Sequence, residues 1–195
     1  MSNGPGACLK RVLAIAIISI TAFIRSDAQS EIPRYSQFEI RGEDVVWENS
    51  YPIAGSADSI RRIVVQMLKS KFFTFNVIRN EAGYNGELRH YKVDCPKYGR
   101  TYFNTPRIYY EGEWTGKFMV DVFDGHYTVT VYALYFERMV KSTDYYRTER
   151  LVKGRYFDAV VTKNKSFRKS EFANLNLMGA SLRDDFNTKN TIPIR

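Results

Sequence analysis

The sequence predicts an α+β fold, in which an antiparallel sheet of about five strands carries two helices on one face. Three observations lead to this prediction. Short segments that alternate apolar and polar residues are numerous, as in a sheet with one solvated face. Two longer segments, one early and one late, repeat their apolar residues at helical spacing. An Asp-Gly pair between two alternating segments indicates an antiparallel hairpin.

Residues 1–28 have the pattern of a secretory signal peptide. Lys10 and Arg11 precede an apolar run from Val12 to Phe23, and the small residues before position 29 offer a cleavage position. The run is shorter than the ~20 residues that a spanning helix needs, so we expect no stable membrane span after cleavage. Cys8 lies ahead of the run, where it cannot become the acylated cysteine of a lipoprotein. We therefore expect an exported protein, periplasmic, surface-located or secreted, without a lipid anchor.

The remainder has the length of one domain. We expect a signal peptide at 1–28, a polar and loosely ordered leader at 29–43, a single domain at 44–187 and a tail at 188–195. Residues 138–169 are charged and aromatic without a clear period, and they form either an extra hairpin or a mobile excursion. Cys95 is the one cysteine outside the signal segment, so no internal disulfide is expected and the thiol acts as a small hydrophobe.

The first strand and the first helix of the domain follow each other directly. The segment 45–53 is rich in β-formers and ends in a break that contains a proline. Ser56 is then a candidate N-cap for a helix. The apolar stripe of this helix consists of Ile60, Ile63, Val64, Met67 and Leu68. Because strands precede and follow the helix, we expect this stripe to face the core.

Two further strands and a long loop occupy the middle of the chain. We expect strands at 72–79 and 87–93, joined by a polar turn that contains Gly83 and Gly86. The loop covers 94–106, where prolines and a glycine interrupt any regular pattern.

The Asp124-Gly125 pair joins strands expected at 117–123 and 126–136 in a two-residue turn. This turn pairs Phe123 with His126 and places the pairs Val122–Tyr127, Val120–Val129 and Phe118–Val131 on an apolar face. The opposite, mostly polar face holds the pairs Asp121–Thr128, Met119–Thr130 and Lys117–Tyr132. A slip of one residue would bury Lys117 and Asp121, so the register is strongly specified.

A second amphipathic helix is expected from Ser170 to Asn187. Its buried side consists of Phe172, Leu175, Leu182 and Phe186. Gly179 lies near that side and permits close approach of a neighbour, although glycine weakens a helix interior.

The order strand, helix, four strands, helix resembles a small exported domain family of unknown function, common in Bacteroidetes and assigned a TATA-binding-protein-like fold. The matching motifs are VVWENSYPIAGSADSI, MLKSKFF, the hairpin KFMVDVFDGHYTVTVYAL and the end of the signal segment, DAQS. The resemblance covers residues 44–137 and the final helix, and the chain departs from it at 138–169. It implies the β-α-β-β-β-β-α architecture and export, but no activity and no site residues.

The net charge and the motif search limit the classes of partner and of function that we expect. The formal net charge of +8 attracts polyanions, which for an exported protein are lipids, acidic glycans or wall polymers, so no nucleic-acid partner is expected. No spacing matches a metal site, a cofactor loop or an activated nucleophile. We therefore expect no catalytic residue, metal or cofactor; the oligomeric state is left open.

Aromatic residues gather in the long loop and in the strand expected after it. Exposed tyrosine and tryptophan stack on sugars or anchor a protein partner. The candidate binding residues are Tyr98, Tyr102, Tyr109, Tyr110 and Trp114; alternatively, these residues pack the sheet or fix the loop to it. The predicted function is an exported, non-catalytic binding or envelope-associated accessory domain, with a protein or glycan of the cell envelope as its partner.

The alternative function is a hydrolase of envelope polymers. Glu111 and Glu113 would point to the same side of a strand, and glycoside hydrolysis uses a pair of carboxylates. Such pairs usually come from separate elements that flank a cleft, so a solvated strand face also explains these two glutamates.

Overall fold

The computed structural model describes residues 32–71, 78–79, 82–141 and 149–190. The strands are β1 (Arg34–Tyr35), β2 (Phe38–Arg41), β3 (Asp44–Pro52), β4 (Ile78–Arg79), β5 (Gly83–Tyr91), β6 (Glu113–Phe123), β7 (His126–Lys141) and β8 (Glu149–Arg155). The helices are α2 (Ala57–Lys71), α3 (Arg107–Tyr110), α4 (Tyr156–Val160) and α5 (Phe172–Asp185). Short 3₁₀ turns occur at Pro96–Tyr98, Lys169–Glu171 and Thr188–Asn190.

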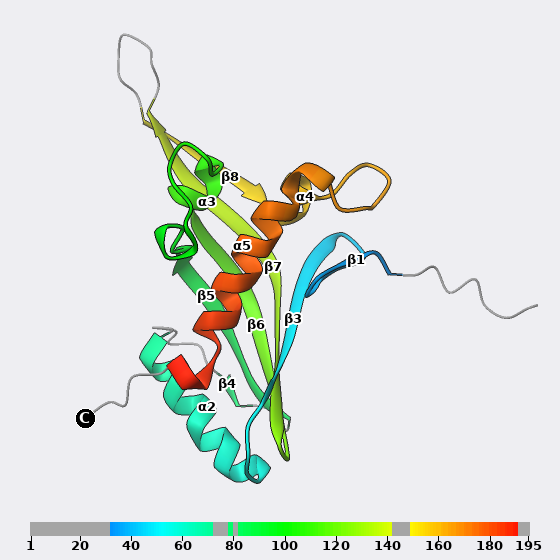
Figure 1. Cartoon of the computed structure of the whole chain (residues 1–195), viewed down its shortest axis with the longest axis vertical. Helices are drawn as coiled ribbons and strands as arrows, with labels where there is room; N and C mark the ends of the chain where they lie inside the picture. The colour runs from blue at the N-terminus through cyan, green and yellow to red at the C-terminus, as the bar shows by residue number, and fades with distance from the viewer. Residues whose placement is uncertain (1–31, 72–77, 80–81, 142–148, 191–195) are drawn as a thin grey trace, which may run out of the picture. The chain divides into compact units, whose positions relative to one another are not determined.

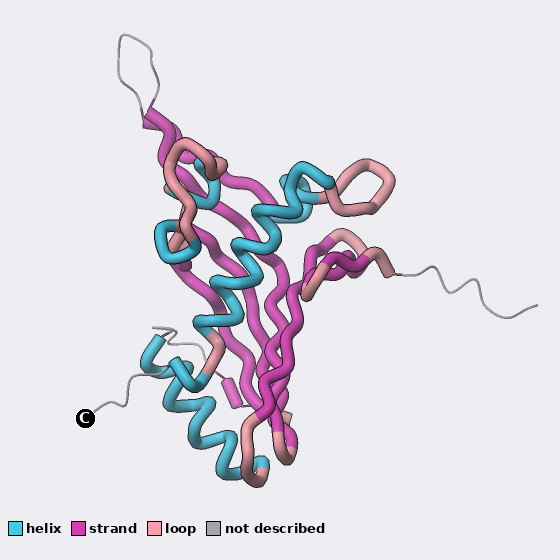
Figure 2. The backbone as a smooth tube through the Cα atoms, in the orientation of Figure 1, coloured by secondary structure: helices cyan, strands magenta, loops and turns pink. Residues whose placement is uncertain are grey.

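The expected fold class is confirmed: one antiparallel sheet carries the long helices α2 and α5 on one face (Figures 1 and 2). The strand order is β1-β2-β3-β7-β6-β5-β4, and β8 pairs with β7 off this path. The first half of β7 pairs with β3 and its second half with β8. The described sheet has eight strands rather than about five, because segments expected to lie outside it contribute strands.

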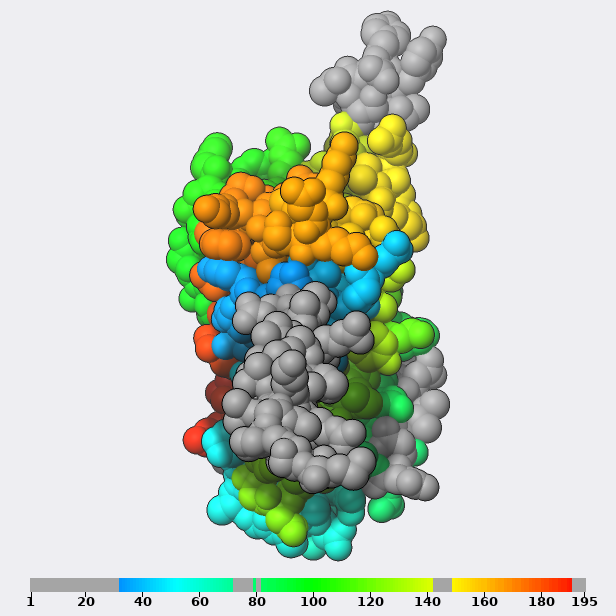
Figure 3. Space-filling model, turned by 90° about the vertical axis from the view of Figure 1, so that its right-hand side faces the viewer, coloured from blue at the N-terminus to red at the C-terminus, as the bar shows by residue number. Residues whose placement is uncertain are grey.

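Two of those segments are the leader and the excursion. The leader expected at 29–43 is not loosely ordered where the structure describes it, since it forms β1 and β2 and buries Phe38 and Ile40. In the excursion expected at 138–169, the extra-hairpin alternative is correct: β7 extends to Lys141 and pairs with β8. Figure 3 shows the segment after β8 beside β1 and β2 on the surface. The ring of Tyr35 in β1 stacks on that of Phe172, the first residue of α5, with the ring centroids 3.9 Å apart.

The hairpin register is confirmed at every expected pair from Phe123–His126 to Lys117–Tyr132. Its apolar face is buried, as expected, and contributes Phe118, Val120 and Val129 to the core. The turn also caps a helix, because the carboxylate of Asp124 accepts a hydrogen bond from the backbone N–H of Ala57 at 2.7 Å. The backbone N–H of Gly125 also donates to the carbonyl oxygen of Gly55 at 3.1 Å, so both turn residues tie the hairpin to the segment that starts α2.

The turn expected at Gly83 and Gly86 is wrong, since both glycines lie inside β5. A Cβ atom at Gly83 would lie 1.8 Å from the carbonyl oxygen of Val120, and one at Gly86 would lie 2.3 Å from the ring of Phe118. These glycines therefore permit close packing of β5 on β6 rather than a chain reversal. Of the strand expected at 72–79, residues 72–77 lie outside the described part, and β4 holds the last two.

The helices bury most of the residues expected to face the core. In α2, Ile60, Val64, Met67 and Leu68 are buried, but Ile63 is 39% exposed and does not belong to the core stripe. In α5, Gly179 allows close approach as expected: a Cβ there would lie 3.2 Å from the ring of Phe38. No helix in the described ranges is long and apolar enough to cross a membrane.

Two β-bulges bend the strands at the end of the sheet where α3 lies. On β7 the register shifts at Ala133, whose φ of 51° is unusual for a residue with a side chain. The carboxylate of Asp44 holds this conformation by accepting a hydrogen bond from the Ala133 N–H at 2.6 Å. On β5 the bulge is at His90, with a φ of 52°.

Candidate functional site

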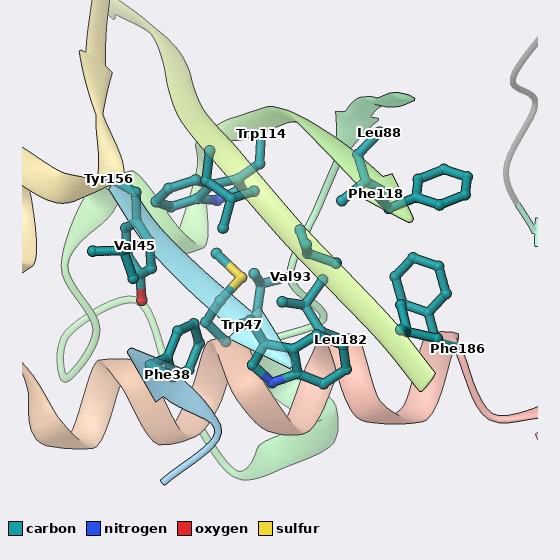
Figure 4. Close-up of a cluster of buried hydrophobic side chains, with 14 of the residues drawn as sticks. Phe38, Val45, Trp47, Leu88, Val93, Trp114, Phe118, Tyr156, Leu182 and Phe186 are labelled. Carbon is teal, nitrogen blue, oxygen red and sulfur yellow. The ribbon is translucent and has the colours of Figure 1, made fainter. Parts of the chain in front are cut away.

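Two of the five candidate binding residues are core residues. Tyr109 and Trp114 have no exposed surface, so they cannot form a ligand-contact surface and the alternative reading, packing against the sheet, is correct for them. The centroid of the Trp114 ring lies 5.4 Å from that of Tyr109 and 5.2 Å from that of Tyr156 (Figure 4 shows Trp114 and Tyr156). This cluster fixes α3 and the start of β6 to the core.

The aromatic cluster buries polar atoms as well as rings. Among the described residues, the hydroxyls of Tyr109 and Tyr156 and the indole N–H of Trp114 make no hydrogen bond of full geometry, although the two hydroxyls interact with each other. Burial raises the pKa of both tyrosines, in Tyr156 well above the usual range. Cys95 is buried nearby, and its thiol donates to the carbonyl oxygen of Tyr109 at 3.4 Å.

Tyr98 fixes the long loop to α5. Its hydroxyl lies 2.9 Å from the carboxylate of Asp184, which also binds the ammonium group of Lys97 at 2.7 Å. Burial, followed by the interactions with Asp184, raises the pKa of Tyr98 to about 12. These contacts give Tyr98 a structural role, in agreement with the alternative that the aromatics fix the loop.

The remaining candidates lie on the surface together with a residue outside the candidate set, Phe103. Tyr102 is 38% exposed, Tyr110 is 37% exposed and Phe103 is 96% exposed. The ring of Tyr102 makes edge contacts with Phe103 at 5.8 Å and with Tyr110 at 5.6 Å. The guanidinium of Arg107 lies over the Tyr102 ring at 5.4 Å. We call Tyr102, Phe103 and Tyr110 the aromatic surface.

A groove of about 460 Å³ lies next to the aromatic surface and shares Arg107 with it. Its lining comes from α3 and the residue after it, from the start of β6 and from the outer parts of β7 and β8. The lining residues are Arg107, Glu111, Glu113, Glu137, Arg138, Met139, Val140, Lys141 and Leu151. Met139 and Leu151 are exposed apolar side chains, so the groove offers both apolar and charged contacts.

Each of the three carboxylates in the groove has a cationic partner. Glu111 pairs with Arg138 at 3.3 Å, and Glu137 pairs with Lys153 at 2.5 Å. Glu113 accepts hydrogen bonds from Lys92 at 2.9 Å and from His90 at 2.7 Å. These bonds, that of Lys92 first, lower the pKa of Glu113.

Arg107 differs from the other cations of the groove. Among the described residues, no carboxylate lies within ion-pair distance of its guanidinium. Its guanidinium lies over the ring of Tyr102, and the residue is exposed, so its N–H donors can reach a ligand. The groove therefore presents an uncompensated positive charge beside exposed aromatic rings.

The predicted arrangement of Glu111 and Glu113 on one strand is wrong, because Glu111 follows α3 as its C-cap and only Glu113 belongs to β6. Both residues line the groove, but a general acid needs a raised pKa and that of Glu113 is lowered. Within the described ranges, no group of three or more His, Cys, Asp or Glu side chains could hold a metal ion.

Comparisons with known proteins give only distant structural likenesses. No protein-family model matches the sequence, and no curated protein matches it. A TBP-like protein from Parabacteroides distasonis ATCC 8503 is similar with a TM-score of 0.45 and 14% identity over 78% of this chain and 97% of that chain. A DUF4468 family protein from Bacteroides ovatus ATCC 8483 is similar with a TM-score of 0.46 and 12% identity over 88% of this chain and 99% of that chain.

Proposed function

We propose that this chain is an exported, non-catalytic binding domain, and that the aromatic surface and the adjoining groove contact its partner. The observation that carries the proposal is the exposure of Phe103, a phenylalanine of which 96% is in contact with solvent. A large apolar ring that stays in water does not stabilise the fold. Exposed aromatic residues that lie together are typical of interaction sites. Tyr102 and Tyr110 extend this surface and anchor it to α3.

The compartment in this proposal rests on the signal-peptide pattern of residues 1–28, which lie outside the described residues. An exported binding domain meets proteins and glycans of the cell envelope. Aromatic rings recognise both classes, by stacking on sugar rings or by filling pockets of a protein. Cell fractionation tests the compartment, and recovery of the full-length chain in the cytoplasmic fraction would refute export.

The binding proposal is tested by capture on the purified chain of material from envelope extract and from isolated cell wall, with identification by mass spectrometry. We expect one protein or polymer to be enriched, and Phe103→Ala to abolish the enrichment without a change in thermal stability. Phe123→Ala is the matched control, because Phe123 is also exposed (47%) but lies at the hairpin turn, at the opposite end of the sheet from α3 (Figure 1). Equal capture by the Phe103 variant and the parent chain would contradict the proposal.

A further inference from the structure

Strand β7 extends beyond the strand that flanks it on one side. β6 begins at Glu113, which pairs with Glu137, whereas β7 continues through Lys141. Along Arg138–Lys141, β8 pairs with one edge of β7, and no described strand pairs with the other. The backbone N–H and C=O groups on such an edge are a template for another strand.

The groove borders this open edge. Arg138, Met139, Val140 and Lys141 line it from the strand, while Arg107 and Glu111 line it from the side of α3. A charged residue that points inward often protects a sheet edge from pairing. Here Arg138 is only 17% exposed and its charge is compensated by Glu111, and Arg138–Lys141 line the groove rather than a closed interface.

The charged residues that line the groove determine which kind of ligand it favours. Its carboxylates are paired, whereas Arg107 has no carboxylate partner among the described residues. A guanidinium that is held by stacking binds a carboxylate strongly, through charge-assisted hydrogen bonds. The groove therefore favours a ligand that brings its own carboxylate to Arg107.

We propose that the groove binds an extended, acidic peptide segment of a partner protein by strand addition to β7. The backbone of the segment pairs with the edge at Arg138–Lys141, and an acidic side chain binds Arg107. Its flanking apolar side chains contact Met139, Leu151 and the aromatic surface. This inference rests on the proposed binding function and narrows the partner from a protein or glycan to a protein, because a glycan has no backbone amides to continue the sheet.

The probe is a pool of short synthetic peptides that alternate glutamate with varied apolar residues. One control pool carries lysine in place of glutamate, and a second carries N-methyl groups on alternate backbone amides. Binding to the purified chain is measured by fluorescence anisotropy, and hydrogen exchange of Arg138–Lys141 is followed with and without the acidic pool. The variants are Arg107→Gln and, as a matched control, Arg62→Gln, which removes an exposed arginine on α2.

We expect the acidic pool to bind at least about tenfold more tightly than the lysine pool, since charge-assisted hydrogen bonds are strong. Arg107→Gln should remove this preference, Arg62→Gln should preserve it, and amide exchange in Arg138–Lys141 should slow on binding. Equal binding of the N-methylated pool would overturn strand addition, and equal binding of the lysine pool would overturn the role of Arg107.

Failure of this inference is distinguishable from failure of the proposed function. If no pool binds but Phe103→Ala still abolishes capture of a wall polymer, the partner is a glycan and the peptide inference is overturned while the binding function stands. If no pool binds and capture does not depend on Phe103, both are overturned.

Discussion

Removal of one hydroxyl from two buried tyrosines should change the stability of the protein in opposite directions. Tyr127 and Tyr156 both have no exposed surface. The hydroxyl of Tyr127 donates to the carbonyl oxygen of Phe186 at 2.7 Å and accepts from the N–H of Thr188 at 3.2 Å. The hydroxyl of Tyr156 makes no hydrogen bond of full geometry among the described residues and interacts only with the equally buried hydroxyl of Tyr109.

The expected magnitudes follow from these environments. Tyr127→Phe breaks two hydrogen bonds and leaves buried groups unpaired, which should lower the free energy of unfolding by about 1–3 kcal/mol. Tyr156→Phe keeps the ring and removes a desolvated hydroxyl, which should raise the free energy of unfolding by about 1 kcal/mol. The two variants carry the same chemical change, so each serves as the control for the other.

Urea unfolding followed by circular dichroism measures both effects. With a slope of about 2 kcal/mol per molar urea, Tyr156→Phe should raise the midpoint by about 0.5 M and Tyr127→Phe should lower it by at least that amount. A lower midpoint for Tyr156→Phe would refute the reasoning, because it would mean that the hydroxyl is satisfied in solution, for example by a buried water molecule.

Three further predictions test other parts of the structure. Trp114→Ala should lower the free energy of unfolding by about 3–5 kcal/mol, since the indole is fully buried; an intact, equally stable variant in urea would contradict its place in the core. Asp124→Ala should cost about 1 kcal/mol by uncapping α2, while Asp124→Asn should retain most of the stability; equal urea midpoints for all three chains would refute the cap. Asp184→Asn should lower the urea midpoint at pH 7, because the ammonium of Lys97 lowers the pKa of Asp184 in the folded state. That stabilisation is present above the usual carboxyl pKa of 3.8 and is lost as the pH falls through the lowered value, so the midpoints should converge in acid; a difference independent of pH would count against the ion pair.

The hairpin shows where sequence reasoning was sufficient. The Asp-Gly turn and the period of two fixed every expected pair of β6 and β7, because a slip by one residue would bury charges. The same local logic located α2 and α5, whose apolar residues recur at helical spacing. The α+β class followed from these elements alone.

The glycines and the added strands show where sequence reasoning was not sufficient. Gly83 and Gly86 look the same in a turn and in a strand that packs closely on its neighbour, and only the approach of β6 distinguishes the two cases. The polar leader and the excursion became strands because β3 and β7 offered them edges. Strand pairing between distant segments leaves little trace in a local pattern.

The candidate site also combines a feature that the sequence predicted with features that only the fold decided. The sequence by itself determined that aromatic residues gather between residues 98 and 114, but not which of them face solvent. Trp114 and Tyr109 became core because β6 and the short helix α3 direct them inward, whereas Phe103 in the preceding loop remained 96% exposed. Only the tertiary structure brought Arg107 to the open edge of β7, since the groove joins α3 to strands far along the chain. Composition and period decide what each segment can form, while the side that a residue faces depends on neighbours that the chain meets only when it folds.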